Sequence, residues 1–144
     1  CNGHVVPVYN VLAAMTGALL LNALAHLWGA PSQALLAFAL LAIAAGAFLK
    51  ERYWRFVDVD AAASTPATAT GLGSLGKVRR IALALGFVLP ALLLLVAALL
   101  GPVPAAIASA IAPVPALAGV LAERWLFFAE ARHTAALYYG AGAA

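Results

Sequence analysis

The stretch from Ile81 to Leu100 contains no charged side chain and consists mostly of leucine, alanine and valine. A helix needs about 20 mostly apolar residues to cross the roughly 30 Å hydrocarbon core of a bilayer, so this stretch predicts a membrane-spanning helix. We predict three more such helices, over about 5–28, over 31–49 and within 105–137. Short connections, "GAPS" and "GPVP", join them in pairs. We therefore expect an all-α fold: a polytopic membrane helix bundle of about four transmembrane helices in two hairpins, forming a single domain.

Composition supports a membrane protein and excludes an ordinary soluble domain. Hydrophobic residues make up 66% of the 144 residues and charged residues 9%, against about 45–50% and about 25% in soluble domains. The net charge of +3 does not indicate nucleic-acid binding, because most lysines and arginines flank apolar segments between positions 50 and 80. Cys1 is the only cysteine, which excludes an internal disulfide. Its first position favours a truncated chain over a lipidated mature terminus.

The polar stretch 50–80 separates the two hairpins, and we predict that it forms a loop. At its start, Tyr53 and Trp54 stand among cations, a mixture typical of the lipid–water boundary. Near its end, "GLGSLG" matches a dinucleotide-binding pattern but lacks the required strand before it. We therefore interpret that segment as a flexible loop. In the apolar segments, Pro90 predicts a kink. Pro113 and Pro115 predict either another kink or a short piece over 105–112 followed by a helix from about Ala116.

The final apolar stretch, "AERWLFFAEARHTAALYYG", carries four charged side chains and a histidine. A charge in hydrocarbon costs several kcal/mol, so each should face a partner or water. At about 100° per residue, Glu123 and Glu130 share one face of a helix, which Arg124 and His133 flank on either side. These four residues are our candidate polar seam.

Three interpretations of the seam stay open. It could relay protons or hydrogen-bond a quinone head, or the charges could pair with one another or with helices absent from this chain. Alternatively, the helix could end near Arg124 and the remainder lie along the membrane surface. His26 is a weaker candidate for a quinone or proton ligand, since a boundary histidine reaching toward headgroups explains it better. We expect no metal site, because the three histidines are far apart and lack cysteine support.

Three stretches together resemble one family: "KERYWRFVD" (50–58), "STPATATGLGSLGKVRRIALALGFVLP" (64–90) and, most specifically, "AERWLFFAEARHTAALYYG" (122–140). They are similar to the membrane anchor subunit of dimethyl sulfoxide reductase, within the wider polysulfide-reductase-like quinol-interacting anchors. The resemblance covers nearly the whole chain. Such anchors have about eight helices, so it implies that these four are the carboxy-terminal half.

The resemblance also implies a function in anaerobic electron transport at the bacterial inner membrane. An anchor of this kind is a non-catalytic subunit that oxidises menaquinol or ubiquinol without a haem or metal of its own. It passes electrons to an iron–sulfur subunit, which feeds a molybdopterin catalytic subunit. Glu123, Arg124, Glu130 and His133 match the family's last-helix motif, and their role is our inference. The family's quinol ligands belong to the amino-terminal half and have no match here.

Two other functions stay open, half of a transporter or channel and a purely structural membrane anchor. Kinked helices with buried charges also line transport paths. Membrane orientation is likewise open. The positive-inside rule predicts a cytoplasmic central stretch, whereas family anchors are usually drawn with both termini outside, which places this stretch outside.

Overall fold

The computed structural model describes the backbone of residues 5–64 and 69–140, and the side chains of residues 6–55, 76–126 and 128. Every element in these ranges is helical. In chain order the elements are α1 (Val5–Leu27), α2 (Gln33–Ser64), α3 (Ala69–Leu83), the π-helical turn η2 (Ala84–Val88), α4 (Leu89–Leu99), α5 (Pro102–Ile111) and α6 (Pro113–Gly140).

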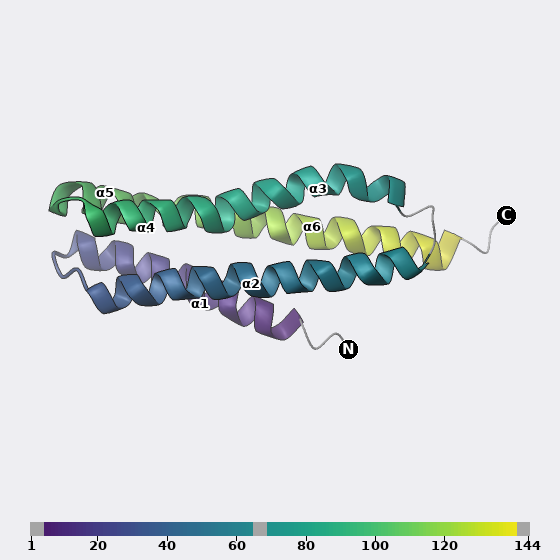
Figure 1. The fold of residues 1–144 in the computed structure, drawn as a ribbon, viewed down its shortest axis with the longest axis horizontal. Helices are drawn as coiled ribbons and strands as arrows, with labels where there is room; N and C mark the ends of the chain where they lie inside the picture. Colours follow the sequence, from purple (N-terminus) through teal and green to yellow (C-terminus); the bar gives the residue numbers. More distant parts are fainter. Residues whose placement is uncertain (1–4, 65–68, 141–144) are drawn as a thin grey trace.

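Four segments of these helices are long and apolar enough to cross a membrane, which confirms the predicted fold class. They are Val6–Leu27, Gln33–Arg55, Gly76–Leu99 and Pro102–Leu126. Two short connections, between α1 and α2 and between α4 and α5, lie at the same end of the bundle (Figure 1). The connection between α2 and α3 lies at the opposite end (Figure 1). The chain therefore forms the expected pair of hairpins.

The first hairpin turns at Gly29, whose backbone lies in the left-handed region with φ of 71°. The amide of Ala30 donates to the carbonyl of Ala25 at 2.8 Å, and the amide of Gly29 donates to that of His26 at 3.2 Å. This pair of hydrogen bonds is the Schellman arrangement, which satisfies the last carbonyls of a helix and favours glycine at the left-handed position. Pro31 follows and prevents the helix from continuing.

The predicted polar loop over 50–80 is wrong over most of its length. Helix α2 continues to Ser64, just before Pro66, and α3 begins at Ala69. The "GLGSLG" segment belongs to α3, so its interpretation as a flexible loop is also wrong. Glycine disfavours a helix by only about 1 kcal/mol. The α3 side chains Val78 and Ala82 pack against α6, and such tertiary packing can outweigh an unfavourable local propensity.

The prolines interrupt the last two spans in different ways. At Pro90 the chain widens into the π-turn η2, where the amide of Leu89 donates to the carbonyl of Ala84. Proline has no amide to donate, so the regular ladder cannot continue through it. In the fourth span α5 ends at Ile111 and α6 begins at Pro113. The alternative of two separate helices is thus correct, with the second starting earlier than predicted because proline suits the first helical position.

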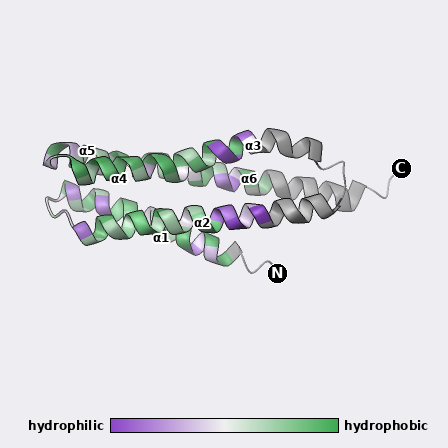
Figure 2. Cartoon of the chain, viewed as in Figure 1, coloured by the Kyte–Doolittle hydropathy of each residue, from purple (hydrophilic) through white to green (hydrophobic). Residues whose placement is uncertain are grey.

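The core follows the axis of the bundle, and most of its outer surface is apolar. Met15, Leu19 and Leu94 are completely buried between the hairpins. Leucines elsewhere, such as Leu99 at 82% exposure, point outward. Figure 2 shows hydrophobic residues along most of the described length of the spans and hydrophilic residues of α2, α3 and α6 nearer the end with the α2–α3 connection. This distribution suits a bundle whose outer surface contacts lipid.

Candidate functional site

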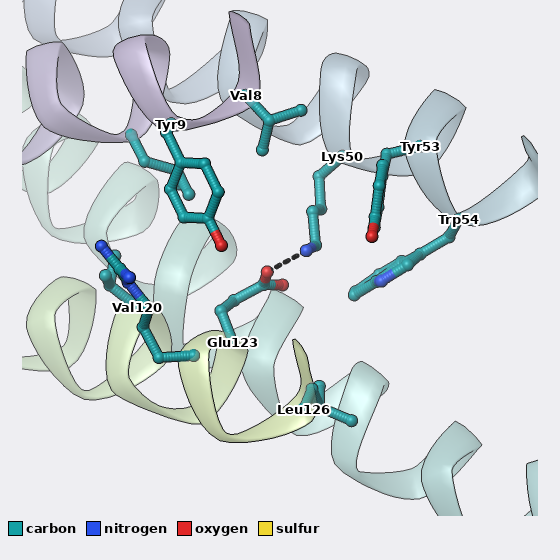
Figure 3. Close-up of a pocket in the computed structure, with 10 residues that line it drawn as sticks. Val8, Tyr9, Lys50, Tyr53, Trp54, Val120, Glu123 and Leu126 are labelled. Carbon is teal, nitrogen blue, oxygen red and sulfur yellow. Dashed lines mark ion pairs between the residues drawn. The ribbon is translucent and has the colours of Figure 1, made fainter. Parts of the chain in front are cut away.

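A small pocket lies where α1, α2 and α6 meet, toward the end of the bundle that carries the α2–α3 connection (Figure 3). Its volume is about 20 Å³, which admits one water molecule. Apolar residues form most of its wall, and charged and aromatic residues form the rest. The lining residues are Val8, Tyr9, Leu12, Lys50, Tyr53, Trp54, Val120, Glu123, Arg124 and Leu126. We call it the Lys50–Glu123 pocket.

An ion pair between Lys50 of α2 and Glu123 of α6 spans the pocket. The two side chains are only 9% and 4% exposed, so both charges are removed from water (Figure 3). Each lies inside a membrane-spanning segment, near the end of that segment. Ionisable residues in such positions are rare and commonly mark a functional path, because an unpaired charge there is costly. Among the described residues, this ion pair is therefore the best candidate for a functional site.

Aromatic rings surround the lysine. The ammonium of Lys50 lies 5.0 Å from the ring centre of Tyr53 and 5.1 Å from that of Trp54. The guanidinium of Arg79, from α3, lies 5.5 Å from the centre of the same Trp54 ring. Such cation–π contacts contribute about 0.5–2 kcal/mol, more when they are desolvated. They hold the ammonium beside Glu123 and connect α3 to the pocket through Trp54.

Arg124 closes the side of the pocket nearest α1. Its guanidinium lies 4.8 Å from the centre of the Tyr9 ring, and its side chain is exposed. The Tyr9 hydroxyl points toward Glu123 in Figure 3. The pocket is therefore lined by the buried Lys50–Glu123 pair on its inner side and by the exposed Arg124 on its outer side. This arrangement places a proton-accepting carboxylate close to the surface without exposing it.

The structure brings together two of the predicted site residues. Glu123 and Arg124 line the same pocket. Glu130 and His133 lie on the continuous helix α6, which excludes the interpretation that the helix ends near Arg124, but their side chains lie outside the described residues. His26 is half-buried in the last turn of α1, about 26 Å along the helix axis from Tyr9. It takes no part in the pocket.

Sequence reasoning missed Lys50, Tyr53 and Trp54 as site residues and assigned them to the lipid–water boundary. The signal was in the spacing. The buried residues Ala39, Ile43 and Gly46 recur every three or four positions, and Lys50, Tyr53 and Trp54 continue that stripe. Residues with this spacing share a helix face. A lysine on the core-facing stripe needs an acidic partner from another helix, and Glu123 is that partner.

A second polar contact lies within the core, nearer the opposite end of the bundle. The amide nitrogen of Asn22, on α1, donates to the hydroxyl of Ser109, on α5, at 3.1 Å. Both side chains are completely buried. The amide oxygen of Asn22 has no hydrogen-bond partner among the described residues. Because this contact is completely buried and joins the two hairpins, we assign it to packing.

Comparisons with family models, with curated proteins and with solved structures find no match to this chain. Among the described side chains, no group of three or more His, Cys, Asp or Glu residues is placed to hold a metal ion. A functional assignment therefore depends on the Lys50–Glu123 pocket and on the sequence stretches described above.

Proposed function

We propose that this chain is the membrane anchor subunit of a molybdopterin oxidoreductase complex in the bacterial inner membrane. In this proposal it oxidises menaquinol or ubiquinol and passes the electrons to an iron–sulfur subunit. The observation that carries the proposal is the buried Lys50–Glu123 pair in its aromatic-walled pocket. Glu123 and Arg124 also belong to the stretch that most resembles such anchors. The pocket thus gives a chemical reason for charges in that stretch.

The pocket suits the release of protons. Oxidation of a quinol supplies electrons and also protons, which need an acceptor within the membrane. The carboxylate of Glu123 is such an acceptor, and its ion pair with the ammonium of Lys50 holds it at the pocket. A single water molecule fits beside the pair and can carry the proton toward the exposed end at Arg124. Lys50 and Glu123 therefore act as proton-handling residues.

The pocket does not fit the quinol ring itself. A volume of about 20 Å³ holds one water and no six-membered ring. The ring must therefore bind next to the pocket, with contributions from helices absent from this chain, as the resemblance also implies. Within the described residues, this chain supplies the proton acceptor and its counter-ion. That division of roles predicts that Glu123 affects the rate of oxidation more than the affinity for quinol.

The test is quinol oxidation by the full-length complex in membrane vesicles carrying Glu123→Gln. We expect the quinol-dependent rate to fall by about 100-fold, the lower part of the range for a positioned acid–base group. Activity with a soluble dye that donates directly to the catalytic subunit should remain bound to the membrane, which shows that the complex is assembled. The matched control is Glu51→Gln, which removes an exposed carboxylate paired with Arg55 on the same end of the bundle.

Each outcome decides between functions. Loss of quinol activity with retained dye activity supports the proposal. Unchanged quinol activity in Glu123→Gln contradicts it. Loss of membrane-bound dye activity while the anchor itself stays folded in the membrane shows that Glu123 serves attachment, which favours a purely structural anchor. If the full-length chain binds no iron–sulfur or molybdopterin subunit at all, the electron-transfer assignment is wrong, and the transporter alternative becomes the one to test.

A further inference from the structure

Exposed basic side chains lie on α2 and α3, which are in contact through Trp54 and Arg79, and the proposed function does not use these side chains. Arg52 and Arg55 lie on α2, and Lys77 and Arg80 lie on α3, all exposed. We call these four residues the basic surface. Glu51, which pairs with Arg55 at 3.0 Å, is the single exposed acidic residue among the described side chains. The basic surface therefore keeps a net positive charge after this pair is counted.

The basic surface lies where two membrane-spanning segments meet the polar end of the bundle. Arg52 and Arg55 belong to the last turn of the span Gln33–Arg55, and Lys77 and Arg80 to the first turns of the span Gly76–Leu99. The Nε of Arg80 donates to the carbonyl of Gly76 at 3.4 Å. This side chain thus extends toward the end of the helix, as a long cation does when it reaches for the headgroup region.

Apolar surface begins directly below the cations. On α2, Phe48 is 61% exposed, and the guanidinium of Arg52 lies 5.8 Å from the centre of its ring. On α3, Ile81 is 55% exposed and lies four residues, about one helical turn, after Lys77 on the same face. The same outer helix surface therefore presents cations at headgroup level and apolar side chains one turn deeper. This vertical order matches a phospholipid, with its phosphate above and its acyl chains below.

We propose that the basic surface binds the headgroups of anionic phospholipids, while Phe48 and Ile81 contact their acyl chains. A guanidinium matches the planar pair of oxygens of a phosphodiester and binds it in a bidentate manner. An anionic headgroup adds net negative charge, which a zwitterionic headgroup lacks. The acidic face of a soluble subunit would satisfy the cations but would leave the exposed apolar residues beside them without a partner. The observations therefore favour a lipid.

The test uses the full-length protein in neutral detergent, titrated with fluorescent phosphatidylglycerol in mixed micelles. We expect phosphatidylglycerol to bind more tightly than phosphatidylcholine, and the double variant Lys77→Gln/Arg80→Gln to lose about 30-fold in affinity for it. The matched control is His26→Gln, which changes a polar side chain in the last turn of α1, at the other end of the bundle, and leaves the basic surface intact. It should lose far less. Inorganic phosphate, added as a competitor, distinguishes a lipid from a free anion.

Three results would overturn the proposal. The first is equal affinity for the two phospholipids, which would mean that the cations are only solvated. The second is displacement by millimolar inorganic phosphate, which would make the surface a general anion site. The third is unchanged lipid affinity in Lys77→Gln/Arg80→Gln together with loss of a co-purifying soluble subunit. That result would assign the surface to protein docking.

Discussion

At the scale of single residues, the buried Lys50–Glu123 pair is the most consequential contact in the described part of the molecule. Burial of two charges costs several kcal/mol per ion, and their mutual attraction offsets that cost only while both are present. A gain in stability is therefore a poor explanation for this buried pair. The pair is better explained by a chemical role, because an apolar pair of the same size would pack there without the desolvation cost.

A double-mutant cycle at this pair tests the reasoning. Lys50→Met alone and Glu123→Gln alone should each destabilise the fold, the former by about 3–5 kcal/mol, because it leaves an unpaired buried carboxylate. The double variant should be much less destabilised than the sum of the two. The free energy of unfolding, measured by denaturant titration in detergent, gives the coupling. Additive effects would show that the two charges do not interact.

The contact between Asn22 and Ser109 predicts a smaller effect. Hydrogen bonds between membrane helices contribute about 0.6 kcal/mol on average and at most about 1.7 kcal/mol. Ser109→Ala should therefore cost about 1 kcal/mol, because it leaves the buried amide of Asn22 without its partner. The double variant Asn22→Leu/Ser109→Ala should recover most of that loss, since no polar group is then buried. The free energy of unfolding, measured in the same way, checks both variants. A double variant that is less stable than Ser109→Ala would contradict this account.

At the scale of elements, η2 and α6 cross with their backbones in close contact at Gly86 and Gly119. A Cβ atom added at Gly119 would lie 2.3 Å from the Cα of Gly86, which no packed structure tolerates. Small residues allow membrane helices to approach this closely, and van der Waals contact then replaces the hydrophobic drive that is absent in lipid. The π-turn before Pro90 is part of this crossing because Gly86 lies within it.

Gly119→Ala should therefore destabilise the bundle by about 1–3 kcal/mol or more, since two backbones must separate. Gly17→Ala is the matched control, because a Cβ added there meets nothing within 4 Å. We expect the control to be neutral or slightly stabilising, since alanine favours a helix more than glycine does. Thermal stability of the two variants in the same detergent compares them. Equal melting temperatures would show that η2 and α6 do not cross at these glycines.

At the scale of the whole molecule, charge is distributed unequally between the two ends. All seven lysines and arginines whose side chains are described lie at or near the end with the α2–α3 connection: Lys50, Arg52, Arg55, Lys77, Arg79, Arg80 and Arg124. The connections at the other end, over 28–32 and 100–101, contain no lysine or arginine. The positive-inside rule places an end of this kind in the cytoplasm. The family resemblance implies the opposite orientation.

We predict that the basic end is cytoplasmic. In a cysteine-free version of the full-length protein, Gln33→Cys should react in intact cells with a maleimide that cannot cross the membrane. Lys77→Cys should react only after the cells are opened. The reverse pattern would support the orientation usual for the family and would show that helices outside this chain set the topology. Labelling of both positions in intact cells would contradict a membrane-spanning arrangement of the segment between them.

A structural property could be predicted from the sequence when it depends only on residues within one segment. The four spans and the two hairpins were predictable because apolar length and turn residues such as Gly29 act within one segment. The helices on both sides of residues 65–68 were not predictable in the same way. In α3, for example, the glycines of "GLGSLG" have a low helix propensity. The helical state of α3 is favoured by its packing against Ala122 and Leu126 of α6. No pattern within α3 alone contains that information.

The sequence by itself determined that this chain is a helical bundle suited to lipid, and it identified Glu123 and Arg124 as residues that need a partner. Only the tertiary structure decided which partners they have. Lys50 and Glu123 are far apart along the chain, and they meet because α1, α2 and α6 converge at one end of the bundle. Hydrophobicity depends on each residue alone and can be counted along the chain. A buried ion pair depends on the relative rotation and depth of separate helices, which packing sets.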